Sequence, residues 1–187
     1  MVLAVRRDAR QRVAEFLTMP EAAPEGERWE LIDGQAILMS PPSERHQQIT
    51  ANLVGRLGEI VQRQGCRALP GLGILNDFVD DYARFPDVVV RCGPLLPDGF
   101  ARDPLLIAEV LSPSTMSRDR GYKAEFHRGL QTLRVYLIDY QDEERVEIFR
   151  RSGSKWSFHS AGIDGTIDLP ELGASLPVSA IYAGLDT

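Results

Sequence analysis

The apolar run LLIAEVL at residues 105–111, together with Pro86-Asp87-Val88-Val89-Val90 earlier in the chain, decides the predicted fold. Each stretch is predicted to form a strand, and the run at 105–111 lacks polar alternation, so this strand is expected to be buried on two faces. Each also contains one acid, Asp87 in the first stretch and Glu109 in the second. A carboxylate inside such a run is costly to desolvate unless a compensating group lies nearby.

Two acids in two buried strands indicate a metal site if the strands are neighbours in the sheet. Mg²⁺ commonly binds one or two protein carboxylates and keeps water and substrate phosphate as its other ligands. The alternative is that each acid marks a strand end, with Asp87 capping a turn after proline and Glu109 pairing with an arginine. The two acids and the basic segment that follows them together favour the metal site.

The surrounding segments predict a mixed α/β domain. Apolar residues at helical spacing predict a helix that begins after Ser43 and runs to about Gln64, and WELIDG followed by QAILMS predicts a hairpin that turns at Asp33-Gly34. Further elements are predicted as helices at 7–17 and about 117–130, as a strand at 73–79, and as three β-rich segments, RVYLIDY, RVEIFRR and KWSFHS.

The length of 187 residues predicts one domain, with an N-terminal helix and linker at 1–27, a core at 28–160 and a C-terminal extension at 161–187. Linker-like stretches at 19–27, 93–104 and 161–177 punctuate this domain without dividing it. The 43% of hydrophobic residues suffice for a core without a disulfide or a metal.

The charge and the cysteines exclude several classes of protein. Lys and Arg number 21 against 27 Asp and Glu, which gives a net charge of −6 and excludes a globally basic nucleic-acid coat or a polybasic membrane-surface protein. Cys66 and Cys92 form no CxxC motif and indicate neither a disulfide framework nor a zinc knuckle. Because no secretion signal or membrane-spanning stretch is visible, a soluble, cytoplasmic protein is expected.

A basic segment follows the Glu109 strand. Between Arg118 and Arg134 there are five basic residues against two acids, so a DNA backbone is expected to bind here, with Arg118 and Arg120 as phosphate-binding residues. Lys123 would reach back over the strand end and stabilise an anionic transition state or orient a water. The alternative is a solvated helix face whose ion pairs contribute little.

Other residues indicate less chemistry. His127 and His159 have no His or Cys at ligand spacing, so a zinc site has little support, and His127 is expected on a helix surface. The tryptophans and tyrosines are scattered, so core packing is expected instead of a stacking ladder for single-stranded nucleic acid. An exposed edge on a late hairpin at 134–150 makes a homodimer reasonable.

Several motifs, in order, resemble the Uma-type family of candidate restriction endonucleases. They are Trp29-Glu30-Leu31-Ile32-Asp33-Gly34, Met39-Ser40-Pro41-Pro42 with His46, Pro86-Asp87-Val88-Val89-Val90, Glu109-Val110-Leu111-Ser112-Pro113-Ser114-Thr115, Asp119 and Lys123. The resemblance spans roughly residues 28–150. It implies the restriction-endonuclease-like fold of the PD-(D/E)XK superfamily, a central mixed β-sheet flanked by α-helices, which binds Mg²⁺ or Mn²⁺ to cleave phosphodiester bonds.

The resemblance also implies the roles of individual residues. Asp87 and Glu109 match the two catalytic acids and would hold the metal together with the Val110 carbonyl. The usual lysine two positions after the second acid is absent, since Leu111 stands there, and Lys123 is the candidate that replaces it. The implied function is that of a Mg²⁺-dependent DNA endonuclease.

Two secondary site residues and one alternative function complete these expectations. Glu30 and His46 recur in the resemblance and are candidates to line the same cleft, with Glu30 assisting the metal through water. The alternative function is a non-catalytic nucleic-acid-binding or protein-assembly module on the same fold.

Overall fold

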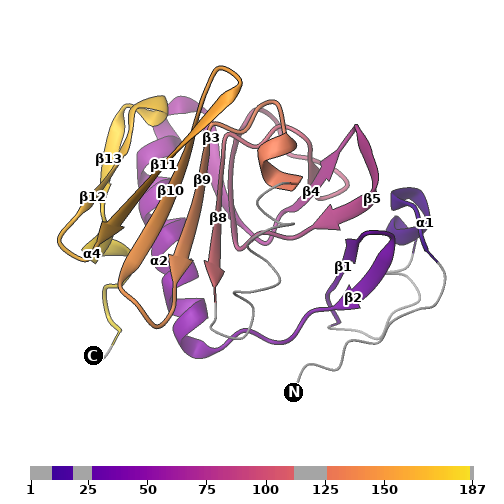
Figure 1. Ribbon diagram of the computed structural model, residues 1–187, viewed down its shortest axis with the longest axis horizontal. Coiled ribbons are helices and arrows are strands. Elements are labelled where there is room, and N and C mark those ends of the chain that lie inside the picture. Colours follow the sequence, from indigo (N-terminus) through magenta and orange to yellow (C-terminus); the bar gives the residue numbers. More distant parts are fainter. Residues whose placement is uncertain (1–9, 19–26, 112–125, 186–187) are drawn as a thin grey trace.

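The computed structural model describes residues 10–18, 27–111 and 126–185. Two main sheets lie side by side, with helices on the six-stranded one (Figure 1). The elements are α1 (Val13–Leu17), β1 (Trp29–Ile32), β2 (Gln35–Leu38), α2 (Glu44–Val61), η2 (Gln62–Gln64), β3 (Cys66–Pro70), β4 (Gly73–Asn76), β5 (Val79–Arg84), β6 (Val88–Cys92), β7 (Phe100–Ala101), β8 (Leu106–Leu111), β9 (Val135–Tyr140), β10 (Arg145–Ser152), β11 (Lys155–Gly162), β12 (Thr166–Leu169), η3 (Pro170–Leu172), β13 (Ala174–Pro177) and α4 (Val178–Ile181).

The six-stranded sheet runs in the order β11-β10-β9-β8-β6-β3, and it contains both acid-bearing stretches. β6 and β8 are antiparallel neighbours, with Val89 opposite Ile107. β8 and β9 are parallel neighbours, and every residue of both strands is buried. The two acid-bearing strands are therefore neighbours, as a shared metal site would require, and the expected burial of the strand at 105–111 on two faces is confirmed.

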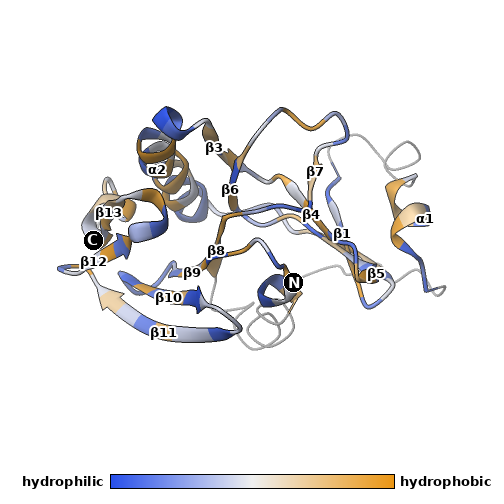
Figure 2. Cartoon of the chain, turned by 90° about the horizontal axis from the view of Figure 1, so that it is seen from above, coloured by the Kyte–Doolittle hydropathy of each residue, from blue (hydrophilic) through white to orange (hydrophobic). Residues whose placement is uncertain are grey.

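Helix α2 covers one face of this sheet (Figure 2). The Ser43 hydroxyl accepts a hydrogen bond from the His46 backbone N–H at 3.2 Å, so the helix begins at the predicted cap. Its buried residues join a core cluster with every second residue of the strands, which we name the α2-side cluster. This cluster includes Ile49, Leu53, Leu57, Val61, Val88, Val90, Leu106, Ala108, Val110, Val135 and Leu137.

The opposite face of the sheet packs against a different set of residues, which we name the far-side cluster. A helical turn at residues 126–129 lies on this face. The far-side cluster contains Ile74, Val89, Ala101, Ile107, Leu111, Phe126, Leu130, Leu133, Tyr136, Ile138 and Tyr140. Since Ile107 and Leu111 both belong to it, the side chain of Glu109 between them points to this face.

The five-stranded sheet, in the order β2-β1-β5-β4-β7, carries the N-terminal hairpin. Asp33 and Gly34 both have positive φ, 50° and 70°, as a two-residue hairpin turn with right-handed strand twist requires. The predicted hairpin is thus confirmed, and helix α1 packs beside it. Within the described residues this helix begins at Val13, because the backbone of its N-cap residue, Arg12, is extended; residues 7–9 of the predicted helix lie outside the described residues.

Two other sequence predictions are wrong, and one strand was missed. The single strand expected at 73–79 is two strands, β4 and β5, with a turn between them, and β3 went unpredicted. The linker-like segment 161–177 contains the β12–β13 hairpin, whose apolar residues complete the α2-side cluster. Short strands rich in Gly, Pro and Ser give little periodicity, so their burial depends on packing that the local sequence does not encode.

The late hairpin at 134–150 does not expose the predicted edge. β9 and β10 are both interior strands, because β11 pairs with β10 along its whole length. The outer strands of this sheet are β11 and β3.

Within the described residues, no helix has both the length and the apolar character needed to cross a bilayer.

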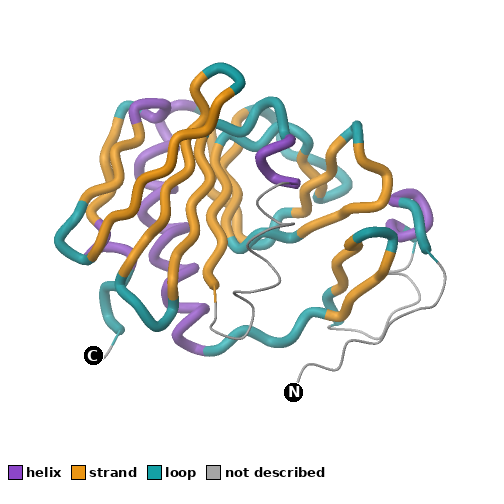
Figure 3. The backbone as a smooth tube through the Cα atoms, viewed as in Figure 1, coloured by secondary structure: helices purple, strands orange, loops and turns teal. Residues whose placement is uncertain are grey.

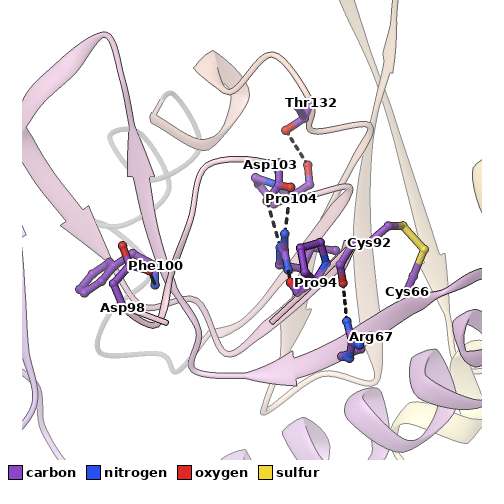
Figure 4. A network of polar contacts seen from close by, with 11 residues as sticks. Cys66, Arg67, Cys92, Pro94, Asp98, Phe100, Asp103, Pro104 and Thr132 are labelled. Atoms are coloured by element: carbon purple, nitrogen blue, oxygen red, sulfur yellow. Dashed lines mark hydrogen bonds and ion pairs between the residues drawn. A yellow bond between two sulfur atoms is a disulfide. The ribbon is translucent and has the colours of Figure 1, made fainter. Parts of the chain in front are cut away.

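Cys66 and Cys92 form a disulfide, contrary to the sequence expectation (Figure 4). They occupy paired positions of β3 and β6, and this register is invisible in a spacing of 26 residues. The following loop is anchored by Arg91, whose Nε and Nη2 donate to the Asp103 carboxylate at 3.0 Å. The disulfide and this ion pair both fix the same end of the edge formed by β3 and β6, where β3 begins and β6 ends.

Reduction of the disulfide is expected to lower the free energy of unfolding by about 3 kcal/mol, because the cross-link restricts the unfolded chain. Urea denaturation with and without dithiothreitol measures the change. The double variant Cys66→Ser/Cys92→Ser serves as the control and should be insensitive to the reductant. Equal stability of the oxidised and reduced wild type would contradict the bond.

Candidate functional site

Asp87 directly precedes β6 and lies against the end of β8. The Val110 backbone N–H donates to Asp87 Oδ2 at 2.7 Å. The antiparallel register pairs Val88 with Ala108, so the start of β6 lies beside Glu109 and Val110. The structure therefore brings the Asp87 carboxylate to the peptide bond that joins Glu109 to Val110.

His46 contacts the same carboxylate from helix α2. Its Nε2 lies 3.2 Å from Asp87 Oδ1, and the two side chains are 16% and 20% exposed. The cap at Ser43 fixes the first turn of the helix and hence the position of the imidazole. Of the two secondary candidates from the sequence, His46 thus touches a primary candidate directly.

Glu109 pairs with a second histidine. His127 Nε2 lies 3.2 Å from Glu109 Oε1, and the residues are 0% and 4% exposed. The imidazole also contacts the rings of Phe126 and Tyr136 at 5.3 and 5.4 Å between centroids. The expectation that His127 lies on a helix surface is wrong, because this side of the helical turn packs onto β9.

The two histidines approach the strand ends from different sides of the six-stranded sheet. His46 belongs to the helix over the α2-side cluster, and His127 follows Phe126 of the far-side cluster. Asp87 and Glu109 are therefore adjacent through the Val110 peptide, while their carboxylates contact different partners. An imidazole holds each acid in place, through a hydrogen bond from His127 to Glu109 and an ion-pair contact between His46 and Asp87.

Asp139 is a third acid at this end of the sheet, and sequence reasoning missed it. It lies opposite Val110 on β9 and is 0% exposed, and neither carboxylate oxygen has a hydrogen-bond partner within the described part of the chain. Burial, and then the nearby Asp87 carboxylate, raise the pKa of Asp139 well above its usual range. The signal was present, since RVYLIDY also places an acid inside an apolar strand.

Glu30 on β1 contacts the residues that lead into Asp87. Its Oε1 accepts from the Phe85 backbone N–H at 3.1 Å, and its Oε2 lies 3.4 Å from Arg84 Nη1. Glu30 and Arg84 are both buried. Glu30 therefore ties β1 to the residues immediately before Pro86 and Asp87.

The three basic candidates from the sequence, Lys123, Arg118 and Arg120, lie outside the described residues. Their roles stay predictions. The Glu109 strand leads directly into the segment that carries them, residues 112–125.

The donor groups at the strand ends suit a hard divalent cation. Carboxylate and carbonyl oxygens are the ligands that Mg²⁺ prefers, and one or two protein carboxylates suffice for it. Asp87, Glu109 and the Val110 carbonyl offer such oxygens, and Asp139 adds a buried carboxylate that has no hydrogen-bond partner among the described residues. In the described ranges no three His, Cys, Asp or Glu side chains form a ready-made metal cluster, so the fit rests on the two acids and on hard oxygen donors.

This mixed sheet with flanking helices, ending in acids at two neighbouring strands, defines a restriction-endonuclease-like α/β protein. Residues 13–179 match the family model Uma2, described as "Putative restriction endonuclease", and the chain belongs to this family. Two Synechocystis proteins are relatives. The protein slr1290 is 27% identical over 85% of both chains, and sll1609 is 33% identical over 76% of this chain and 81% of its own.

A solved structure shares the fold. It is described as "a putative nuclease belonging to DUF820 from Anabaena variabilis", has a TM-score of 0.70 and 21% identity, and covers 89% of this chain and 97% of its own. The predicted fold class is thereby confirmed. Membership of the family supports a nuclease role for the chain.

Asp139→Asn is expected to flatten the dependence of stability on pH. The pKa of Asp139 is raised in the folded state. Below the unfolded pKa of about 3.9 the side chain is protonated in both states, so it does not change the free energy of unfolding. As the pH rises above this value, the unfolded state ionises more readily than the folded state, and the free energy of unfolding falls. At pH 7 in EDTA the variant should have a higher free energy of unfolding than the wild type, and this gain should shrink as the pH falls toward 4.

Urea denaturation between about pH 4 and pH 8 measures this gain. The exposed acid Asp164, changed to Asn, is the matched control and should leave the profile unchanged. A gain of equal size at both ends of the range would show that the charge of Asp139 is not its cause.

Proposed function

We propose that the protein is a Mg²⁺-dependent endonuclease, with Mn²⁺ as an alternative metal, that hydrolyses phosphodiester bonds in DNA. One observation carries the proposal: the Asp87 carboxylate is hydrogen-bonded at 2.7 Å to the Val110 amide, beside Glu109. Two acids from distant parts of the sequence thus meet at one end of a buried sheet. Membership of the Uma2 family supports the same reaction class.

Asp87, Glu109 and the Val110 carbonyl would hold the cation. When bound, a hard divalent cation supplies Lewis-acid chemistry, because it acidifies water and offsets negative charge on the phosphate. The protein's own part is to hold both acids in a fixed orientation at the strand ends. His46 and His127 serve this purpose, since each holds one carboxylate oxygen at 3.2 Å.

Lys123 is the proposed cationic group of the site, where it would position or deprotonate the attacking water. Arg118 and Arg120 would hold phosphates of the DNA backbone. All three follow the Glu109 strand closely in sequence, which supports their assignment to this end of the sheet. We also propose a cytoplasmic location and a homodimer, in which two sites would cut two strands.

Asp87→Asn and Glu109→Gln are expected to abolish nicking of supercoiled plasmid in the presence of Mg²⁺ or Mn²⁺. Each change keeps the shape of the side chain and removes a charged metal ligand, for which losses on the order of 100-fold or more are typical. Conversion of supercoiled to open-circular plasmid on a gel measures the activity. EDTA should protect the plasmid from the wild type.

Glu59→Gln provides a matched control, because Glu59 is an exposed acid on α2 away from the strand ends. This variant should nick like the wild type. Full activity in both the Asp87 and the Glu109 variants would exclude the proposed site.

Calorimetric titration with Mg²⁺ tests the metal site without any substrate. The wild type is expected to bind the cation, and Asp87→Asn should weaken binding by about tenfold or more, since a carboxylate ligand is replaced by a neutral amide. Equal affinity of the two proteins would remove Asp87 from the ligand set.

The alternative is a nucleic-acid-binding or assembly module on the same fold. The absent strand lysine, with Leu111 in its place, favours this alternative. Salt-sensitive binding of DNA without turnover over the range of divalent metals would support it. Loss of both binding and turnover would point to a role in protein assembly.

A further inference from the structure

The described chain contains one surface whose charge opposes that of the whole protein. Residues 126–138 and 148–163 contain five Lys or Arg and no Asp or Glu, while the chain as a whole carries a net charge of −6. The two segments are neighbours in space, because they form the helical turn at 126–129 and the strands β9, β10 and β11. We name the side of these strands that faces the far-side cluster the hairpin surface; it consists of Arg128, Arg134, Phe149, Arg151, Trp156 and Phe158.

Aromatic rings follow one another across the hairpin surface. Tyr136 on β9 lies 6.0 Å from Phe149 on β10, and Phe149 lies 5.1 Å from Phe158 on β11, between ring centroids. Exposure increases along this row, from 1% at Tyr136 to 60% at Phe158. The row therefore ends in a large ring on the outermost strand that presents most of its area to solvent.

Guanidinium groups lie over two of the rings. Arg128 is 5.7 Å from the centroid of Phe149, and Arg151 is 4.8 Å from that of Trp156. Arg151 also donates to the carbonyls of Leu133, Arg128 and Leu130, which fixes it against the surface. Stacked arginine and aromatic groups present flat faces and positive charge at the same place.

The hairpin surface is continuous with the candidate site. His127, which holds Glu109, contacts the ring of Tyr136, the first ring of the row. The hairpin of β10 and β11 extends beyond the neighbouring strands at its tip (Figure 3). Lys155 at this tip and Arg134 at the start of β9 are both exposed.

We propose that the hairpin surface binds a single-stranded segment of nucleic acid, with Phe158 stacking on an unpaired base and with Arg134, and Lys155 at the hairpin tip, holding phosphates on the tip side of that base. Charge decides the occupant, since Arg128, Arg134 and Arg151 on this surface are complementary to a polyanion. Arg150 does not contribute, because it lies on the other face of β10 and pairs with Glu171 at 2.9 Å. The exposed ring decides its form, because every unpaired base offers a face for stacking and a paired base does not. The proposal rests on the nuclease function and adds a substrate-binding surface to it.

Phe158→Ala is expected to weaken binding of a fluorescein-labelled oligothymidylate of about 20 nucleotides by roughly 5- to 100-fold, the loss typical of one stacked base. Binding is measured by fluorescence anisotropy in EDTA, so that no turnover intervenes. Phe158→Trp should restore affinity, because it returns a stacking ring. Duplex DNA of the same length should lose less than about twofold in Phe158→Ala, since its bases are stacked on one another.

Arg134→Glu is expected to weaken binding of single strands. The slope of log affinity against log salt concentration, which is negative, should become shallower by about 0.7, the value for one phosphate contact on a single strand. Two matched controls come from the same chain. Phe78→Ala removes an equally exposed ring, 83% exposed, from the turn between β4 and β5, and Arg63→Glu reverses an exposed charge after α2. Both should bind like the wild type.

The binding assay separates this proposal from the nuclease function. Wild-type affinity in Phe158→Ala, or an equal loss in Phe78→Ala, would overturn the hairpin surface even if plasmid nicking still requires Asp87. Conversely, single-strand binding that depends on Phe158 and Arg134 upholds the surface even if no divalent metal supports cleavage.

Discussion

The hydrogen bond between the Val110 amide and the Asp87 carboxylate is the constraint on which the rest of the site depends. Regular pairing of β6 with β8 ends at Val88, and beyond it the side chain of Asp87 takes the place of a backbone acceptor. A buried amide without an acceptor costs about 1–3 kcal/mol, so the same contact stabilises the strand end and places an acid there. The position of the acid follows from the pairing of two strands that are buried on both faces.

Three acids at this end of the sheet make the metal-free protein carry an electrostatic cost. The contacts with His46 and His127 offset the cost of placing Asp87 and Glu109 there. Asp139 is completely buried, and its pKa is raised by burial and by the nearby Asp87. Desolvated acids are expected where function needs them, since a protein selected for stability alone would fill the same space with apolar residues. A cation would turn the mutual repulsion of Asp87 and Asp139 into attraction to a common charge. The destabilised strand end therefore favours the metal site over a purely structural role.

The sequence predicted the parts of this arrangement that are local, and it failed where register decides. The runs around Asp87 and Glu109, the helix after Ser43 and the Asp33-Gly34 turn each carry their own periodicity or turn chemistry, and all are present. The burial of His127 depends on which side of a short helical turn meets β9, and the Cys66 bond depends on the pairing of two strands. Asp139 was visible by the same criterion as the other acids. It escaped because no second signal accompanied it.

An acidic protein that binds a polyanion must separate its charges in space. Charges beyond about 8–10 Å are largely screened at physiological ionic strength, so the net charge of −6 repels a nucleic acid weakly once local contacts form. The acids at the strand ends attract a cation and would repel phosphate without one. The cations of residues 126–138 and 148–163 lie in segments free of acids, and a row of rings links them to Glu109 through His127. The proposed binding and the proposed chemistry could thus use opposite charges, because the cations lie toward the tip of the β10–β11 hairpin and Asp87, Glu109 and Asp139 lie at the other end of the sheet.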